Sequence, residues 1–196
     1  MKKWLIPVIV IALLAFAFFK WGIGVNNEII DKEGVAQVQW ANVESAYQRR
    51  ADLIPNLVAT VKGYAEHEKE TLEGVIKARA EATKTTINAG DMTPEKMAAF
   101  QKAQSGITGA LSKLMVVVEK YPDLKANQSF LELQSQLEGT ENRINVQRNR
   151  YNNLAGIYNI FIKKIPTSWV ASYRGFKGMS LYKAEAGSEK APKVEF

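Results

Sequence analysis

The chain has 196 residues, a net charge of +6 and no cysteine. The missing cysteine excludes disulfides, thiolate metal sites, a cysteine nucleophile and lipid attachment through an N-terminal cysteine. The basic surplus lies at the two ends of the chain and the middle is nearly balanced. A nucleic-acid-binding domain gathers its cations on one folded face, so this distribution argues against that class.

The N-terminal residues 4–25 form an apolar segment whose only charge is Lys20. As a helix this segment is about 33 Å long, which is enough to cross a bilayer. Trp4 and Trp21 lie near its two ends, where amphipathic rings favour the membrane interface. We therefore expect residues 1–25 to form a transmembrane anchor that contacts the membrane through residues 4–25.

A cleaved signal peptide is the alternative for this segment, and Lys2 and Lys3 would suit it. The small-residue site at 15–17 is poor, however, because two phenylalanines follow it inside the apolar run. An uncleaved signal-anchor is therefore expected. The positive charges before the segment place the N-terminus in the cytoplasm and the rest of the chain outside it.

The remainder of the chain has helical periodicity and almost no strand pattern. Apolar residues recur at steps of 3 and 4 in three long stretches, at residues 36–79, 97–118 and 130–162. Thr93 before Pro94 is typical of a capped helix start. The pattern predicts an all-α fold, a long antiparallel bundle of about four helices over residues 26–183. Residues 184–196 have the composition of a disordered tail.

Pro55 interrupts the first helical stretch. Proline lacks a backbone N–H and disfavours helical geometry at the preceding Ile54, so inside a helix it costs about 3 kcal/mol. We expect a helix break or sharp kink at Pro55, with Asp52 near the new N-terminus. The alternative is a mild kink in one continuous helix.

Two blocks of sequence are similar to a known family. They are "WANVESAYQRRADLIPNLVATVKGYAEHEKETLEGVIKARA" at residues 40–80 and "LQSQLEGTENRINVQRNRYNNLAGIYN" at residues 133–159. They resemble the LemA family of bacterial membrane-anchored proteins. The resemblance implies one N-terminal transmembrane helix, a long antiparallel helical bundle and no established enzymatic activity. It also implies a link to membrane processes such as magnetosome organisation, and it carries no catalytic residues.

The residues themselves point away from catalysis. His67 is the only histidine, so the paired histidines of a zinc protease are absent. Glu66, Glu70 and Glu73 would share one helical face, but a helix lacks the carbonyl ligands that wrap a calcium ion. Phosphate-binding glycine loops and nucleophile elbows are also absent from the sequence. We expect no enzyme activity, no metal and no cofactor.

Four charged residues occupy positions on the apolar stripes: Arg50, Arg79, Glu141 and Arg148. A buried charge is expensive unless it is paired. We expect Glu141 to pair across the bundle with Arg50 or Arg79, which would fix helix register. Alternatively, these long side chains emerge at the edges of the stripes.

Asparagines are frequent in the predicted helices, where they are only fair helix formers. They are Asn56, Asn142, Asn145, Asn152, Asn153 and Asn159. Hydrogen bonds between helices or near breaks are the expected role, and a ligand groove is the alternative.

The segment that follows Pro166 carries the aromatic residues Trp169, Tyr173, Phe176 and Tyr182. So many aromatic side chains close together are not expected to stay in water. The segment either folds back over the bundle or contacts a partner or the membrane surface, helped by nearby lysines and arginines.

These expectations define a non-enzymatic protein in the bacterial inner membrane. The leading hypothesis is a single-pass, membrane-anchored bundle that binds an unidentified membrane-associated protein. The alternative is a structural component that self-associates to organise a membrane region. Nucleic acid is not an expected partner.

Overall fold

A computed structural model describes residues 4–90 and 92–183, and the expected tail at 184–196 lies outside them. The described residues form helices and contain no strand, which confirms the predicted all-α class. The helices are α1 (Leu5–Lys62), α2 (Lys69–Lys84), α3 (Pro94–Val118), α4 (Pro122–Lys125), α5 (Gln128–Lys163) and α6 (Thr167–Arg174).

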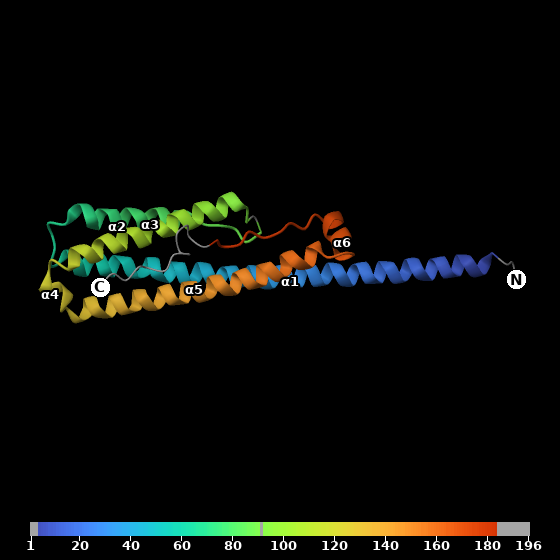
Figure 1. The fold of residues 1–196 in the computed structure, drawn as a ribbon, viewed down its shortest axis with the longest axis horizontal. Coiled ribbons are helices and arrows are strands. Elements are labelled where there is room, and N and C mark those ends of the chain that lie inside the picture. Colours follow the sequence, from blue (N-terminus) through green and yellow to red (C-terminus); the bar gives the residue numbers. More distant parts are fainter. Residues whose placement is uncertain (1–3, 91, 184–196) are drawn as a thin grey trace, which may run out of the picture.

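The four long helices form an up-and-down bundle (Figure 1). Helix α1 extends along the whole molecule, and α5 runs antiparallel to it over the part distant from the N-terminus. The antiparallel pair α2 and α3 packs together, with α2 also against α1. The short α6 crosses beside α1 near the point where α1 leaves the bundle.

Two helix starts show why the local sequence folds as it does. Thr93 accepts a hydrogen bond from the Lys96 amide at 3.3 Å, and Pro94 occupies the first turn of α3, as the sequence predicts. Asn127 caps α5 in the same way by accepting from the Phe130 amide at 3.0 Å. Because Phe130 is itself buried, this cap also positions a core side chain.

The bundle interior contains two apolar clusters stacked along its length. The cluster nearer the N-terminal end of α1 is rich in aromatic residues, and includes Trp40, Tyr47, Phe100, Tyr151, Tyr158 and Tyr182. The distal cluster is mainly aliphatic, and includes Ile54, Leu57, Val61, Leu72, Ile107, Leu114 and Leu137. Burial of this apolar surface is the main stabilising contribution to the fold.

The first part of α1 lies outside both clusters. Residues 4–19 are exposed, and their large apolar side chains contact no other helix over most of this length. By length and composition the N-terminal part of α1 can cross a membrane. Helix α1 passes position 25 without interruption, so the expected anchor and the start of the bundle belong to one helix.

The expected helix break at Pro55 is absent, because α1 continues through Pro55 to Lys62. The chain turns instead at residues 63–68, inside the stretch that the periodicity assigned to one helix. Pro55 lies on the exposed face, while Ile54 and Leu57 on either side are fully buried. Continuing the buried stripe therefore outweighs the cost of the proline.

A side chain from another helix compensates for the hydrogen bond that Pro55 cannot make. The missing N–H would have bonded to the carbonyl of Ala51, four residues earlier. The Nε of Arg79 in α2 donates to this carbonyl oxygen at 2.8 Å. Since Ala51 is buried, an unpaired carbonyl there would be costly, and Arg79 removes that cost.

We predict that Pro55 and Arg79 are energetically coupled. Arg79→Ala should lower the free energy of unfolding by about 1–2 kcal/mol, because it leaves the Ala51 carbonyl without a donor. In a Pro55→Ala background the same change should cost at least about 1 kcal/mol less, since an alanine in place of the proline supplies the missing N–H. Denaturant unfolding of the four proteins measures this cycle, and additive effects would contradict the assignment.

Candidate interaction sites

A layer of polar side chains separates the two apolar clusters. Arg50 is 3% exposed and donates to the Glu141 carboxylate at 2.9 Å. It also donates to the side-chain and backbone oxygens of Gln104 at 2.9 and 3.1 Å, and to Thr108 at 3.3 Å. The layer thus links α1, α3 and α5. Because charged hydrogen bonds require specific partners, it favours a single register of these helices.

The Arg50 layer borders a small cavity of about 70 Å³. The buried Nε of Arg50 and Nε2 of Gln101 have no protein partner among the described residues. A cavity of this size has room for ordered water. Buried donors of this kind are normally satisfied, so we expect ordered water here.

The other two charged stripe residues have partners elsewhere in the chain. Arg79 does not reach Glu141 but binds the carbonyl of Ala51, as described above. The Arg148 guanidinium lies 4.7 Å from the ring centre of Tyr182, a cation–π contact. Arg148 therefore contacts the C-terminal segment, and Arg50 is the arginine that meets Glu141.

Two asparagines on α5 bind the backbone of the C-terminal segment 177–183, which we call the strap. Asn159 donates to the Met179 carbonyl at 2.8 Å and accepts from the Met179 amide at 2.7 Å. Asn152 makes the same pair of bonds with Tyr182, at 3.0 and 2.9 Å. The two asparagines are seven residues apart, so they lie on the same face of α5.

The tyrosines that precede these asparagines add further bonds to the strap. The hydroxyl of Tyr151 donates to the Ser180 carbonyl at 2.7 Å, and that of Tyr158 donates to the Lys177 carbonyl at 2.8 Å. Burial, reinforced by the charge of Glu33, raises the pKa of Tyr158 to about 12, so the hydroxyl remains a donor at neutral pH. Both Tyr-Asn dipeptides of the "YNNLAGIYN" block, at 151–152 and 158–159, therefore hydrogen-bond to the backbone of the strap and not to its side chains.

The strap approaches α5 closely at Gly178. A Cβ at Gly178 would lie 3.1 Å from Oδ1 of Asn159, which is tighter than ordinary packing. The expected hydrogen-bonding role of the asparagines thus applies to Asn152 and Asn159, with the strap as their partner. Periodicity alone does not reveal these contacts, because the polar positions lie beside the apolar stripe.

The four aromatic residues of the C-terminal segment divide into two groups. Tyr182 is buried in the core beside Trp40, with ring centres 5.7 Å apart, and Phe176 is partly buried. Trp169 and Tyr173 on α6 remain 60% and 91% exposed. The segment therefore folds back over the bundle at Tyr182, while α6 presents aromatic side chains to the surroundings.

An open groove of about 1010 Å³ runs between α2 and α3. Its lining includes small residues such as Gly74, Ala78, Ala103, Gly106 and Gly109. The α2 side carries Glu70, Glu73 and Glu81 together with Lys77, and the α3 side carries Lys102 and Lys113. The two sides of the groove therefore differ in the sign of their charge.

Within the described ranges, no group of three or more histidine, aspartate or glutamate side chains is arranged to hold a metal ion. His67 is exposed in the turn between α1 and α2. The polar groups that do converge, around Arg50 and along the strap, bond to other parts of the same chain. Their arrangement supports the fold.

These features define the class of the protein as an all-α bundle carried on a helix with a candidate N-terminal membrane span. A sequence model of the LemA family matches residues 39–196. The chain belongs to the LemA family, as the two sequence blocks predict.

Curated relatives show the same relationship. The chain is 30% identical over 164 residues to magnetosome protein MamQ of Magnetospirillum gryphiswaldense, covering 75% of this chain and 60% of MamQ. It is 30% identical to MamQ 2 of Paramagnetospirillum magneticum over 77% of this chain and 62% of the relative. Protein LemA of Metamycoplasma hominis is 25% identical, over 83% and 70% of the two chains. The chain thus spans under two thirds of the MamQ proteins.

Proposed function

We propose that this chain is a non-enzymatic, single-pass protein of the bacterial inner membrane whose bundle binds other proteins beside the membrane. The observation that supports this proposal most is the continuity of α1, which joins an exposed apolar segment to a packed bundle. A continuous helix would hold the bundle along the membrane normal. The anchor would also keep the bundle at a high effective concentration for partners in the membrane. The N-terminus would lie in the cytoplasm and the bundle outside it.

Site-specific photocrosslinking in intact cells tests this interaction role. Ile76 on α2 and Val116 on α3 are large apolar residues that are 52% and 68% exposed in the bundle. A photoreactive residue at either position should capture a discrete protein, and the exposed Glu132 on α5 provides the control position. Failure of both apolar positions to capture any discrete protein would contradict the proposal.

A second candidate function is self-assembly, and the charges of the α2–α3 groove favour it. Two copies anchored in one membrane with the same orientation are related by a twofold axis along the membrane normal, parallel to the bundle. Around such an axis the α2 of each copy would face the α3 of the other. Acidic side chains of α2 would then meet Lys102 and Lys113 across the interface, and the small residues would allow close approach.

Charge exchange tests the self-assembly candidate. Because α2 and α3 are antiparallel, Glu70 and Lys113 lie towards the same end of the groove. Lys113→Glu should weaken the dimer about tenfold, since two like-charged pairs would replace two attractive ones. Adding Glu70→Lys should restore it, whereas Lys120→Glu outside the groove should change little. Single-molecule photobleaching in nanodiscs gives the dimer fraction, and a monomeric wild type would contradict this candidate.

The names of the MamQ relatives assign those proteins to magnetosomes. We propose for this chain only the shared part, a membrane-anchored bundle that could organise a membrane region. The similarity leaves more than a third of each MamQ protein unmatched, so a magnetosome role is not transferred.

A further inference from the structure

A second groove, of about 710 Å³, lies between the N-terminal part of α1 and α6. Its walls include Phe18, Phe19, Trp21 and Ile23 of α1 and Trp169 and Val170 of α6. The volume lies within the range of roughly 300–1,000 Å³ that is usual for small-molecule sites. Nearly all of these side chains are apolar, so the groove suits a hydrocarbon ligand.

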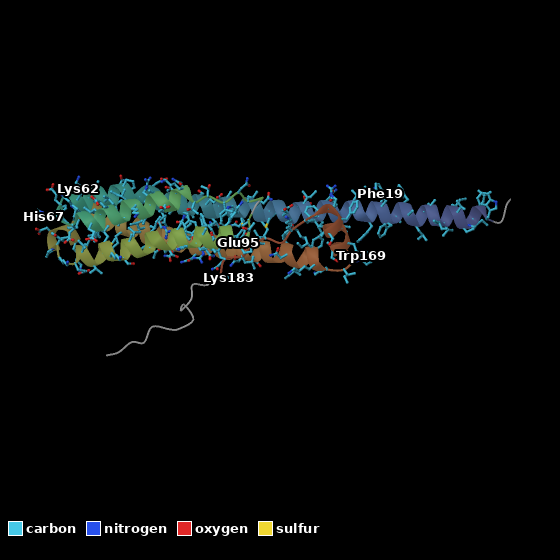
Figure 2. The ribbon with its side chains drawn as sticks, turned by 90° about the horizontal axis from the view of Figure 1, so that it is seen from above. Phe19, Lys62, His67, Glu95, Trp169 and Lys183 are labelled. Carbon is cyan, nitrogen blue, oxygen red and sulfur yellow. The ribbon has the colours of Figure 1, made fainter. Side chains whose placement is uncertain are left out.

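The position of this groove points to the bilayer as the source of the ligand. The groove begins at Ala15, inside the apolar segment, and ends at Asn26, just past its expected boundary. Figure 2 places Trp169 and Phe19 at the same level along α1, where the apolar part of this helix leaves the bundle, and both line the groove. The groove is thus continuous with the surface that the segment would present to lipid.

The exposure of α6 supports the same source. Trp169 and Tyr173 are 60% and 91% exposed in the folded chain. Aromatic rings of this kind are preferred at membrane interfaces, where one end of the ring is apolar and the other is wet. An eight-residue helix beside the end of the anchor places them at that depth. In a bilayer these side chains would face lipid instead of water.

A cation at the mouth of the groove adds charge complementarity. The Nε of Arg174 donates to Oδ1 of Asn26 at 3.0 Å, which ties the end of α6 to α1. Arg174 lines the groove, so its guanidinium lies where an acyl chain would meet its headgroup. Guanidinium groups bind phosphate through strong charged hydrogen bonds.

We propose that this groove binds an anionic phospholipid, with an acyl chain between α1 and α6 and the phosphate at Arg174. This inference goes beyond the proposed function, which requires an anchor but no specific lipid. The ligand comes from the surrounding membrane, so the site is filled on insertion. Its occupancy would brace α6 against α1 at the base of the bundle.

Tryptophan quenching by brominated lipids tests the site in the full chain reconstituted in phosphatidylcholine vesicles. A Trp4→Phe background removes the tryptophan at the far end of the anchor, and Trp40 is fully buried in the core. The emission that remains sensitive to lipid then comes from Trp21 and Trp169, which both line the groove. We expect brominated phosphatidylglycerol to quench this emission in a saturable manner at low mole fraction, and brominated phosphatidylcholine only in proportion to its abundance.

Matched charge variants locate the headgroup. Arg174→Gln should raise the phosphatidylglycerol fraction needed for half-maximal quenching about tenfold, the loss expected for a charged hydrogen bond. Lys177→Gln removes the same charge three residues later, outside the groove, and should shift it less than about twofold. Three results would each overturn the proposal. They are superimposable quenching curves for the two lipids, an equal shift of the half-maximal lipid fraction in both variants, and no quenching of either groove tryptophan. These results leave the protein-interaction role untouched, because photocrosslinking tests that role separately.

Discussion

Replacing Arg50 with alanine should lower the free energy of unfolding by about 3–4 kcal/mol, because it breaks a buried charged network. The variant removes the donor of the buried side-chain oxygen of Gln104 and opens a void between the two apolar clusters. Denaturant unfolding in detergent micelles, followed by circular dichroism, measures the loss. Arg49→Ala is the matched control, since Arg49 is the exposed neighbour and should change stability by less than about 0.5 kcal/mol.

The carboxylate partner of Arg50 should matter much less. The side chain of Glu141 is 44% exposed, so water and salt screen its interaction with Arg50. Glu141→Gln keeps an oxygen acceptor near Arg50 and should cost about 1 kcal/mol or less. Equal losses in Arg50→Ala and Arg49→Ala would show that the polar layer does not stabilise the bundle.

Removing both strap-binding asparagines should release the strap. Asn152→Ala with Asn159→Ala deletes four hydrogen bonds to the strap backbone, and at about 1 kcal/mol each the loss is about 4 kcal/mol. The amides of Met179 and Tyr182 lose their acceptors, so their hydrogen exchange should become faster than in the wild type. Mass spectrometry of peptides from the strap measures this change.

Asn153 provides the control for the strap experiment. It is exposed and lies next to Asn152 on α5, so Asn153→Ala should leave the strap amides protected. Unchanged protection in the double variant would mean that packing of Tyr182 against Trp40, and not the asparagine pairs, holds the strap.

The features that follow from periodicity were predictable from the sequence. The long stripe of α5 and the Thr93 cap of α3 required only the repeat of the α-helix and standard capping rules. The proline at position 55 was misleading because its cost is local, whereas the compensating donor, Arg79, lies 28 residues away from Ala51 along the chain. Local propensity cannot anticipate a donor from another helix.

The candidate sites were harder to predict than the helices. Charges on an apolar stripe need partners, which predicts a pair at Glu141, but the stripe does not distinguish Arg50 from Arg79 as the partner. The pairing of Asn152 and Asn159 with the strap does not follow from periodicity, although the repeat of "YN" at a spacing of seven is a usable signal. The aromatic residues of the C-terminal segment stand out in the sequence, but only the fold separates exposed Trp169 from buried Tyr182.

One unbroken helix would carry the bundle out of the membrane, and a distance between two spin labels on α1, measured by electron paramagnetic resonance, shows whether it does. The chain contains no cysteine, so spin labels can be attached to cysteines placed only at Leu14 and Val38, both exposed on α1. A continuous helix separates their backbones by about 36 Å in nanodiscs, with a single narrow distribution. A broad distribution, or one centred well below this distance, would mean a joint near Gly22 and Gly24 and would contradict the claim.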